Sequence, residues 1–143
     1  MLIGIPSLLP PDLLKILCEM GHGDEIVIGD GNFPAASMAS RLVRCDGHGV
    51  SELLDVILKY FPLDTFSECP VTLMSTAPED KRPEIWNKYE SIVRKHDPRG
   101  GKAIEYVDRF EFYNRAKKAY AIVATGETAL YACMILKKGV VSC

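Results

Sequence analysis

Two hydrophobic patterns alternate along the chain. In one, apolar residues recur three and four positions apart, which gathers them on one face of a helix. This spacing predicts helices over residues 11–20, 51–60, 84–95 and 109–118. In the other, apolar residues follow one another in short runs, as in strands that are buried on both faces. These runs predict strands over residues 25–29, 42–45, 70–74, 103–107, 120–125 and 129–136, and a short strand or apolar plug over residues 2–5.

Residues at the predicted helix starts support these boundaries. Pro11 suits the first turn of a helix, and Asp12 suits the positive end of the helix dipole. Ser51 and Asp108 are residue types whose side-chain oxygens cap helix N-termini. Because strands and helices alternate, we predict an α/β fold, a three-layer α/β/α sandwich with a largely parallel, mixed sheet. No repeat or linker interrupts the pattern, so residues 1–143 are expected to form a single domain.

The composition is that of a globular protein and narrows the classes of function. Hydrophobic residues make up 48% of the 143 residues, and the net charge is −2. The chain therefore lacks the basic surface expected of a protein that binds nucleic acid or an anionic membrane. No apolar run approaches the ~20 residues of a membrane helix, and the first residues do not resemble a signal peptide. The five scattered cysteines lack Cys-x-x-Cys spacing, which favours a reduced, cytoplasmic protein over a disulfide or zinc framework.

Polar residues, most of them ionisable, stand at both ends of the predicted strand at 25–29. His22 and Asp24 precede this strand, and Asp30 and Asn32 follow it. An imidazole exchanges protons near neutral pH, and carboxylates beside it complete a small acid–base site. Ligands of parallel sheets bind outside the carboxyl ends of the strands, which is where Asp30 is expected. No second histidine stands at ligand spacing, so we predict no metal site.

The same stretch carries a family signature. Gly21-His22-Gly23-Asp24-Glu25, followed by Asp30-x-Asn32-Phe33-Pro34, resembles the signature of the D-ribose pyranase and L-fucose mutarotase family. Further blocks that resemble the fucose mutarotase branch lie at residues 62–65, 85–90, 109–119, 124–131 and 135–139. The Phe-Tyr-x-Arg-Ala-Lys-Lys block at 112–118 favours fucose over ribose.

The resemblance implies a cofactor-free isomerase that interconverts the α and β anomers of L-fucose. It also implies a homo-oligomer, commonly a decameric ring, in which a neighbouring subunit completes each site. Two other functions stay open at this point. One is D-ribose pyranase activity, and the other is a non-catalytic ring protein that only binds a monosaccharide.

The resemblance also implies roles for individual residues. The acid–base histidine of the family falls on His22, its catalytic tyrosine on Tyr113 and a second acidic position on Asp64. The substrate-binding positions of the family fall on Asp30, Met74, Tyr113, Tyr131 and Cys133. Close relatives carry Asn at the position of Cys133, and many carry Asp at the position of Ser75. From the residue pattern alone, Met74 and Tyr113 are expected in the core, and Asp64 is equally expected in a turn.

Anomer exchange requires two proton movements. The anomeric hydroxyl loses a proton while the ring oxygen gains one, and reclosure on the other carbonyl face gives the other anomer. In this hypothesis His22 is the acid–base group, Tyr113 is the second proton relay and Asp30 grips sugar hydroxyls. Positioned proton transfer of this kind contributes about 10² to 10⁴ in rate.

Overall fold

The computed structural model describes all residues from 1 to 143. All strands of the chain belong to one mixed sheet. Its strands are β1 Glu25–Gly29, β2 Leu42–Cys45, β3 Val71–Met74, β4 Ile104–Val107, β5 Ala121–Thr125 and β6 Met134–Lys137. They lie in the order β2-β5-β1-β6-β3-β4. Only β6 runs antiparallel to its neighbours, β1 and β3, while the other pairs are parallel. The largely parallel, mixed sheet predicted from the sequence is confirmed.

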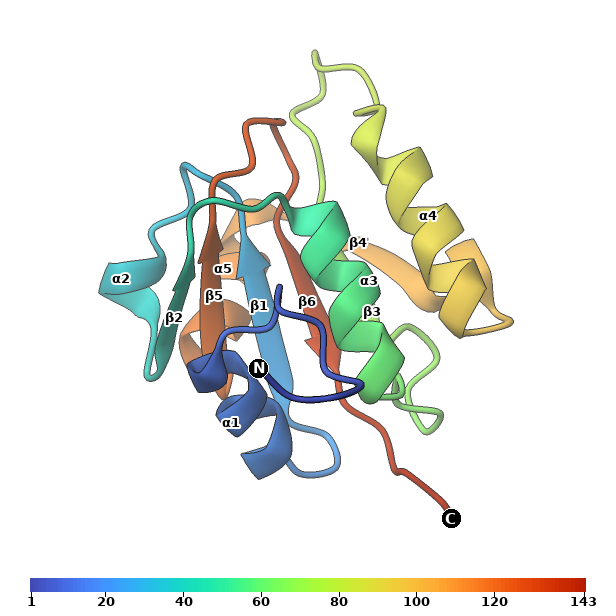
Figure 1. Cartoon of the computed structure of the whole chain (residues 1–143). Coiled ribbons are helices and arrows are strands. Elements are labelled where there is room, and N and C mark those ends of the chain that lie inside the picture. The colour runs from blue at the N-terminus through green and yellow to red at the C-terminus, as the bar shows by residue number, and fades with distance from the viewer.

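Helices cover both faces of this sheet. They are α1 Pro11–Glu19, α2 Ala35–Met38, α3 Val50–Tyr60, α4 Ile85–His96, α5 Arg109–Lys118 and the short 3-10 helix η1 Gly100–Ala103. Helices α1, α3 and α4 lie in front of the sheet in Figure 1, and α5 lies behind it. This arrangement is the predicted three-layer sandwich. No helix is long and apolar enough to cross a membrane.

Successive side chains of β1 point to opposite faces of the sheet, and the core accordingly has two layers. Ile26 and Ile28 belong to the larger apolar cluster, under α1, α3 and α4. Val27 points to the other face and joins a smaller cluster with Phe112 and Ala116 of α5. That face is covered mainly by α5 and the single turn of α2. The pocket described below forms there.

The structure differs from the sequence prediction in three segments. Residues 129–133 form a loop instead of the first half of the last strand, which begins at Met134. Residues 2–5 form no strand: residues 2–4 are exposed, and only Ile5 packs, partly buried, against the larger apolar cluster. Helix α2 was not predicted, because a single turn of four residues is too short to show helical spacing.

The sheet has two edges with different loops. The loops after β1, β3 and β5 leave from the carboxyl edge, which is uppermost in Figure 1. The loops that precede these strands lie at the opposite, amino edge. His22 stands in the loop between α1 and β1, and Asp30 directly follows β1. The fold therefore places these two residues at opposite edges.

Candidate active site

A pocket of about 220 Å³ opens at the carboxyl edge of the sheet. It is lined by Asp30, Asn32, Phe33, Met74, Tyr113, Leu130, Tyr131 and Cys133. All five residues that the resemblance marked as substrate-binding are among them, although they come from four separate parts of the chain. Ser75 follows Met74 but does not line the pocket. The mixture of a carboxylate, two phenols and apolar walls suits a small polar ligand with an apolar face.

Hydrogen bonds hold Asp30 at the end of β1. Its backbone N–H donates to Sγ of Cys133 at 3.4 Å, and its carboxylate accepts from the N–H of Asn32 at 2.9 Å. The next residue, Gly31, donates to the carbonyl of Glu127 at 2.8 Å, which ties the loop after β1 to the loop after β5. Asp30 is therefore held at the pocket by bonds within its own loop and to Cys133, and the loops after β1 and β5 support each other.

An aromatic cluster forms the wall nearest α5. The ring of Phe33 packs edge-on against Tyr113 and Phe112, with centroid separations of 5.8 Å and 5.9 Å. This packing requires glycine at position 29, because a Cβ there would lie 2.8 Å from the Phe33 ring. Asp108 caps α5, since its carboxylate accepts from the N–H of Glu111 at 2.9 Å. The start of α5, and with it Tyr113, is thereby held beside the pocket.

Cys133 is unsuited to act as a base in this pocket. Its side chain is buried, and burial raises the pKa of the thiol above its usual value, as does the nearby charge of Asp30. The thiol therefore stays protonated at neutral pH. Its contribution is the Sγ atom that accepts the backbone N–H of Asp30.

His22 and Asp64 form a separate pair at the amino edge. Nε2 of His22 lies 3.0 Å from Oδ1 of Asp64. The carboxylate of Asp64 also accepts from the N–H of Phe66 at 3.1 Å and from the hydroxyl of Ser67 at 3.0 Å. Burial opposes the ionisation of Asp64, but the hydrogen bonds from His22, Phe66 and Ser67 outweigh it and lower the pKa of the carboxyl. The imidazole thus faces a carboxylate that is ionised at neutral pH.

The His22 side chain is turned outward. It is 46% exposed, whereas the side chain of Asp64 is 6% exposed. The ring of Phe66 lies 5.3 Å from the imidazole and is itself largely exposed. The pair therefore presents an imidazole and a phenyl ring to whatever lies beyond the amino edge.

The structure does not unite His22 with Asp30 inside one chain. The five residues of β1 separate them, and at ~3.3 Å per residue the strand alone is ~16 Å long. The expectation that both loops around β1 build one acid–base site within a chain is therefore not met. Glu25, at the start of β1, pairs instead with Arg115 at 2.7 Å.

Some pocket residues were missed by sequence reasoning as ligand contacts. Asn32 and Phe33 were named as parts of the family signature but not as substrate contacts, and Leu130 was assigned to a predicted strand. Leu130 could have been predicted as a pocket residue because it precedes Tyr131, which the family motif marked as substrate-binding. For Asn32 and Phe33 the signal is that they follow Asp30 at the carboxyl end of a strand.

Comparisons with known proteins identify relatives that match nearly the whole chain. The sequence profile of the RbsD / FucU transport protein family matches residues 3–141. Fucose mutarotase from Homo sapiens is 50% identical, over 97% of this chain and 94% of the human protein. L-fucose mutarotase from Actinobacillus pleuropneumoniae serotype 5b (strain L20) is 46% identical, over 98% of this chain and 97% of that protein.

Solved structures give the same result at the level of the fold. The fucose mutarotase from Streptococcus pneumoniae, solved in complex with L-fucose, superposes with a TM-score of 0.95 at 52% identity, covering 99% of this chain and 100% of that one. RbsD from Bacillus subtilis, complexed with D-ribose, superposes with a TM-score of 0.72 at 26% identity, covering 94% of this chain and 95% of that one. On its sequence and its fold, this chain belongs to the RbsD / FucU transport protein family.

Proposed function

We propose that this protein interconverts the α and β anomers of L-fucose by opening and reclosing the pyranose ring. The observation that carries the proposal is the full-length likeness, at 52% identity and a TM-score of 0.95, to a fucose mutarotase solved with L-fucose. The RbsD complexed with D-ribose is more distant in both identity and TM-score. Fucose is therefore favoured over ribose as the substrate.

The carboxyl-edge pocket suits a monosaccharide. Its volume of about 220 Å³ matches one sugar ring better than an extended ligand. L-Fucose carries hydroxyl groups, for which the Asp30 carboxylate is a strong acceptor, and a methyl group, for which Phe33, Met74 and Leu130 offer apolar surface. Asp30, Met74, Tyr113, Tyr131 and Cys133 are accordingly the proposed substrate contacts.

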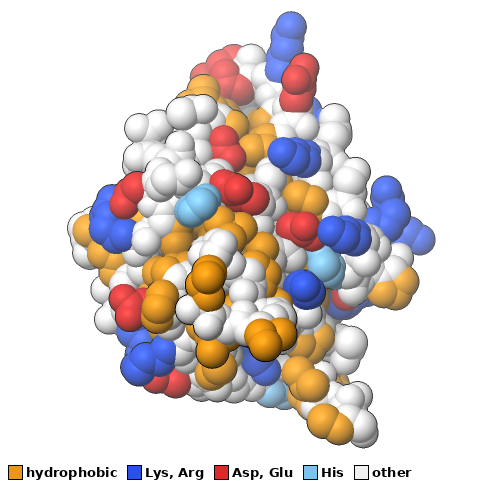
Figure 2. Space-filling model, in the orientation of Figure 1, with side chains coloured by type: hydrophobic (Ala, Val, Ile, Leu, Met, Phe, Trp, Pro, Cys, Tyr) orange, Lys and Arg blue, Asp and Glu red, His pale blue; other side chains and the backbone are white.

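The pocket of a single chain holds two phenols and a carboxylate but no imidazole. We therefore place His22 and Asp64 of a neighbouring copy at the mouth of this pocket, in a homo-oligomer for which the family resemblance implies a decameric ring. Support comes from the outward, half-exposed imidazole of His22. Exposed apolar side chains, including Met1, Leu2 and Ile3, provide surface for such association. Figure 2 shows hydrophobic side chains gathered on one face of the molecule.

In the resulting mechanism, His22 and Tyr113 move the two protons. One takes the proton of the anomeric hydroxyl while the other protonates the ring oxygen, and the roles reverse on reclosure. Asp64 holds the ring of His22 in place through their hydrogen bond of 3.0 Å. Asp30 holds the sugar so that the anomeric centre faces both groups. The side chains of the site suffice for this chemistry, so no cofactor is invoked.

We place the protein in the cytoplasm. All five cysteines are free thiols, and two of them are exposed. Free thiols persist in reducing compartments.

Saturation-transfer NMR tests the proposed function. With L-fucose at anomeric equilibrium, irradiation of one anomeric proton should attenuate the other in proportion to the protein added. D-ribose and D-galactose, measured in the same way, should show weaker exchange. Binding of L-fucose without added exchange would instead identify a non-catalytic sugar-binding protein, and faster exchange with D-ribose would identify a pyranase.

A further inference from the structure

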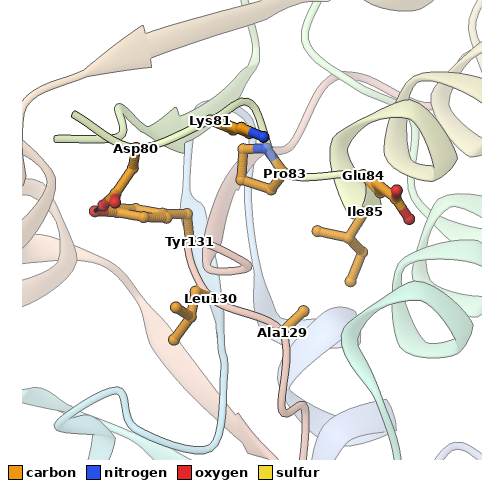
Figure 3. Close-up of a pocket in the computed structure, with 8 residues that line it drawn as sticks. All are labelled: Asp80, Lys81, Pro83, Glu84, Ile85, Ala129, Leu130 and Tyr131. Atoms are coloured by element: carbon orange, nitrogen blue, oxygen red, sulfur yellow. Dashed lines mark hydrogen bonds between the residues drawn. The ribbon is translucent and has the colours of Figure 1, made fainter. Parts of the chain in front are cut away.

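Tyr131 stands in the wall between two hollows at the carboxyl edge. The proposed sugar pocket lies on one side, and a hollow of about 490 Å³ lies on the other. The second hollow is lined by Asp80, Lys81, Pro83, Glu84, Ile85, Ala129, Leu130 and Tyr131 (Figure 3). Only Leu130 and Tyr131 line both. The position of the Tyr131 ring therefore sets the boundary of the sugar pocket, and the contacts that hold this ring determine that position.

The backbone of Tyr131 is held from α4. Tyr131 has a φ of 55°, in the left-handed region that a residue with a side chain rarely adopts. The indole N–H of Trp86 donates to the carbonyl of Tyr131 at 2.8 Å, and the hydroxyl of Tyr89 donates to the carbonyl of Ala132 at 2.8 Å. A strained backbone conformation persists only where surrounding contacts hold it in place. The hydrogen bonds from Trp86 and Tyr89 provide these contacts.

The ring of Tyr131 is held from the loop after β3. Its hydroxyl donates to the carboxylate of Asp80, which lies beside the phenol end of the ring in Figure 3. The same hydroxyl accepts from the N–H of Ala77 at 3.2 Å. A phenol has a single proton, and that of Tyr131 is committed to Asp80. The hydroxyl of Tyr113, in contrast, takes part in no hydrogen bond within the chain, although Tyr113 lines the same sugar pocket.

We propose that Asp80 is a positioning residue that holds the Tyr131 ring as a fixed wall of the sugar pocket and withdraws its hydroxyl proton from the reaction. The two pocket tyrosines then differ in role: Tyr131 packs its ring against the sugar, and Tyr113 keeps a hydroxyl free to move a proton. The proposal rests on the proposed function, because it takes the pocket at Asp30 as the sugar site.

The test compares kinetic constants of variants in the clamp. We expect Asp80→Ala to raise the KM for L-fucose roughly fivefold, the effect of losing one hydrogen bond, and to change kcat by less than about twofold. Asp80→Asn should restore a KM near the wild-type value, because the amide oxygen still accepts from the phenol. Glu79→Ala is the matched control, since it removes the same charge from the same loop but leaves both hydrogen bonds of the Tyr131 hydroxyl intact, and its KM should stay unchanged.

A double-variant cycle separates the clamp from a general effect on folding. Tyr131→Phe should raise KM about as much as Asp80→Ala, and the double variant should be no worse than either single variant, because both remove the same bond. An unchanged KM in Asp80→Ala, or effects of the two substitutions that multiply, would overturn the proposal.

A binding measurement makes the two proposals separable. Trp86 is the only tryptophan of the chain and is bonded to Tyr131, so its fluorescence should report on L-fucose binding. Asp80→Ala should weaken the Kd from this titration roughly fivefold. A wild-type protein that binds but does not exchange anomers would overturn the proposed function alone, and an unaltered Kd in Asp80→Ala would overturn the clamp.

Discussion

Nε2 of His22 lies 3.0 Å from the buried Oδ1 of Asp64, across the amino edge of the sheet. The loop that carries Asp64 is fixed in turn, because the guanidinium of Arg99 donates to the carbonyls of Asp64 and Ser67 at 3.1 Å and 2.9 Å. The half-exposed imidazole of His22 is therefore hydrogen-bonded to an ionised carboxylate, that of Asp64, in a loop that is itself held in place. This arrangement suits a group that exchanges protons with a ligand outside its own chain.

Removal of the imidazole should abolish most of the catalysis. We expect His22→Ala to lower the enzymatic rate of L-fucose anomer exchange by about 10² to 10⁴, the usual contribution of a positioned proton-transfer group. Saturation-transfer NMR measures this rate. His48→Ala is the matched control, because His48 is a surface imidazole bonded to Glu52, and its exchange rate should match that of the wild type. An active His22→Ala variant would contradict the assigned role.

If the site is shared between copies, two inactive variants should complement each other. His22→Ala keeps an intact pocket, and Tyr113→Phe keeps an intact imidazole. When the two are co-expressed in equal amounts, about a quarter of the interfaces in a mixed ring should combine both intact parts. Anomer exchange should then recover to about that fraction of the wild-type rate. Mixtures that stay as inactive as the separate variants would place the whole site within one chain.

Acid should weaken the fold through Asp64. Hydrogen bonds lower the folded-state pKa of this carboxyl below its usual value of about 3.9. Its stabilising contribution is therefore present above pH ~4 and is lost as the pH falls through the folded-state pKa. We expect Asp64→Asn to lower the free energy of unfolding by about 1–2 kcal/mol at pH 7, with the difference shrinking toward pH 3. Urea denaturation at a series of pH values measures it, and a difference independent of pH would exclude this linkage.

The cysteines should divide into reactive and protected groups. Cys18 and Cys143 are exposed, whereas Cys45 and Cys133 are buried. Burial raises the pKa of both buried thiols, which lowers their thiolate fraction. Iodoacetamide at pH 8 should therefore label Cys18 and Cys143 of the native protein and leave the buried pair unmodified, as read by peptide mass spectrometry. All five thiols should react in urea, and early labelling of Cys133 in the native protein would contradict the enclosed pocket wall.

Gly126 should not tolerate a side chain. A Cβ at this position would lie 2.1 Å from the carbonyl oxygen of Asp46, a backbone atom that cannot easily give way. We expect Gly126→Ala to cost about 2 kcal/mol or more, seen as a fall in Tm of several degrees. Gly47→Ala is the control, because a Cβ there meets nothing within 4 Å. Equal Tm values for the two variants would show that the loop after β5 relaxes freely.

Local patterns were enough to predict most of the elements. Strand β1 was predicted with its observed bounds, Glu25–Gly29, because a continuous apolar run between glycines is a local signal. The cap at Asp108 was also predictable, since it depends only on residues within one turn. The family motif further marked Asp30, Met74, Tyr113, Tyr131 and Cys133, which the fold gathers into one pocket.

Other features depend on contacts between segments that are distant in the sequence. The apolar residues at 129–133 matched a strand pattern, but hydrogen bonds from Trp86 and Tyr89 hold this segment as a loop. The hydrogen bond between Tyr131 and Asp80 joins residues 51 positions apart, and no pattern of spacing in the sequence predicts it.

The sequence by itself determined the order of helices and strands, the α/β class and the chemical identity of the candidate residues, because propensity, spacing and motif are properties of neighbouring positions. Only the tertiary structure decided which of those residues meet. It brought Asp30 to Tyr113 and Cys133 at one edge and left His22 with Asp64 at the other, because an extended strand holds its two ends apart whatever chemistry they carry.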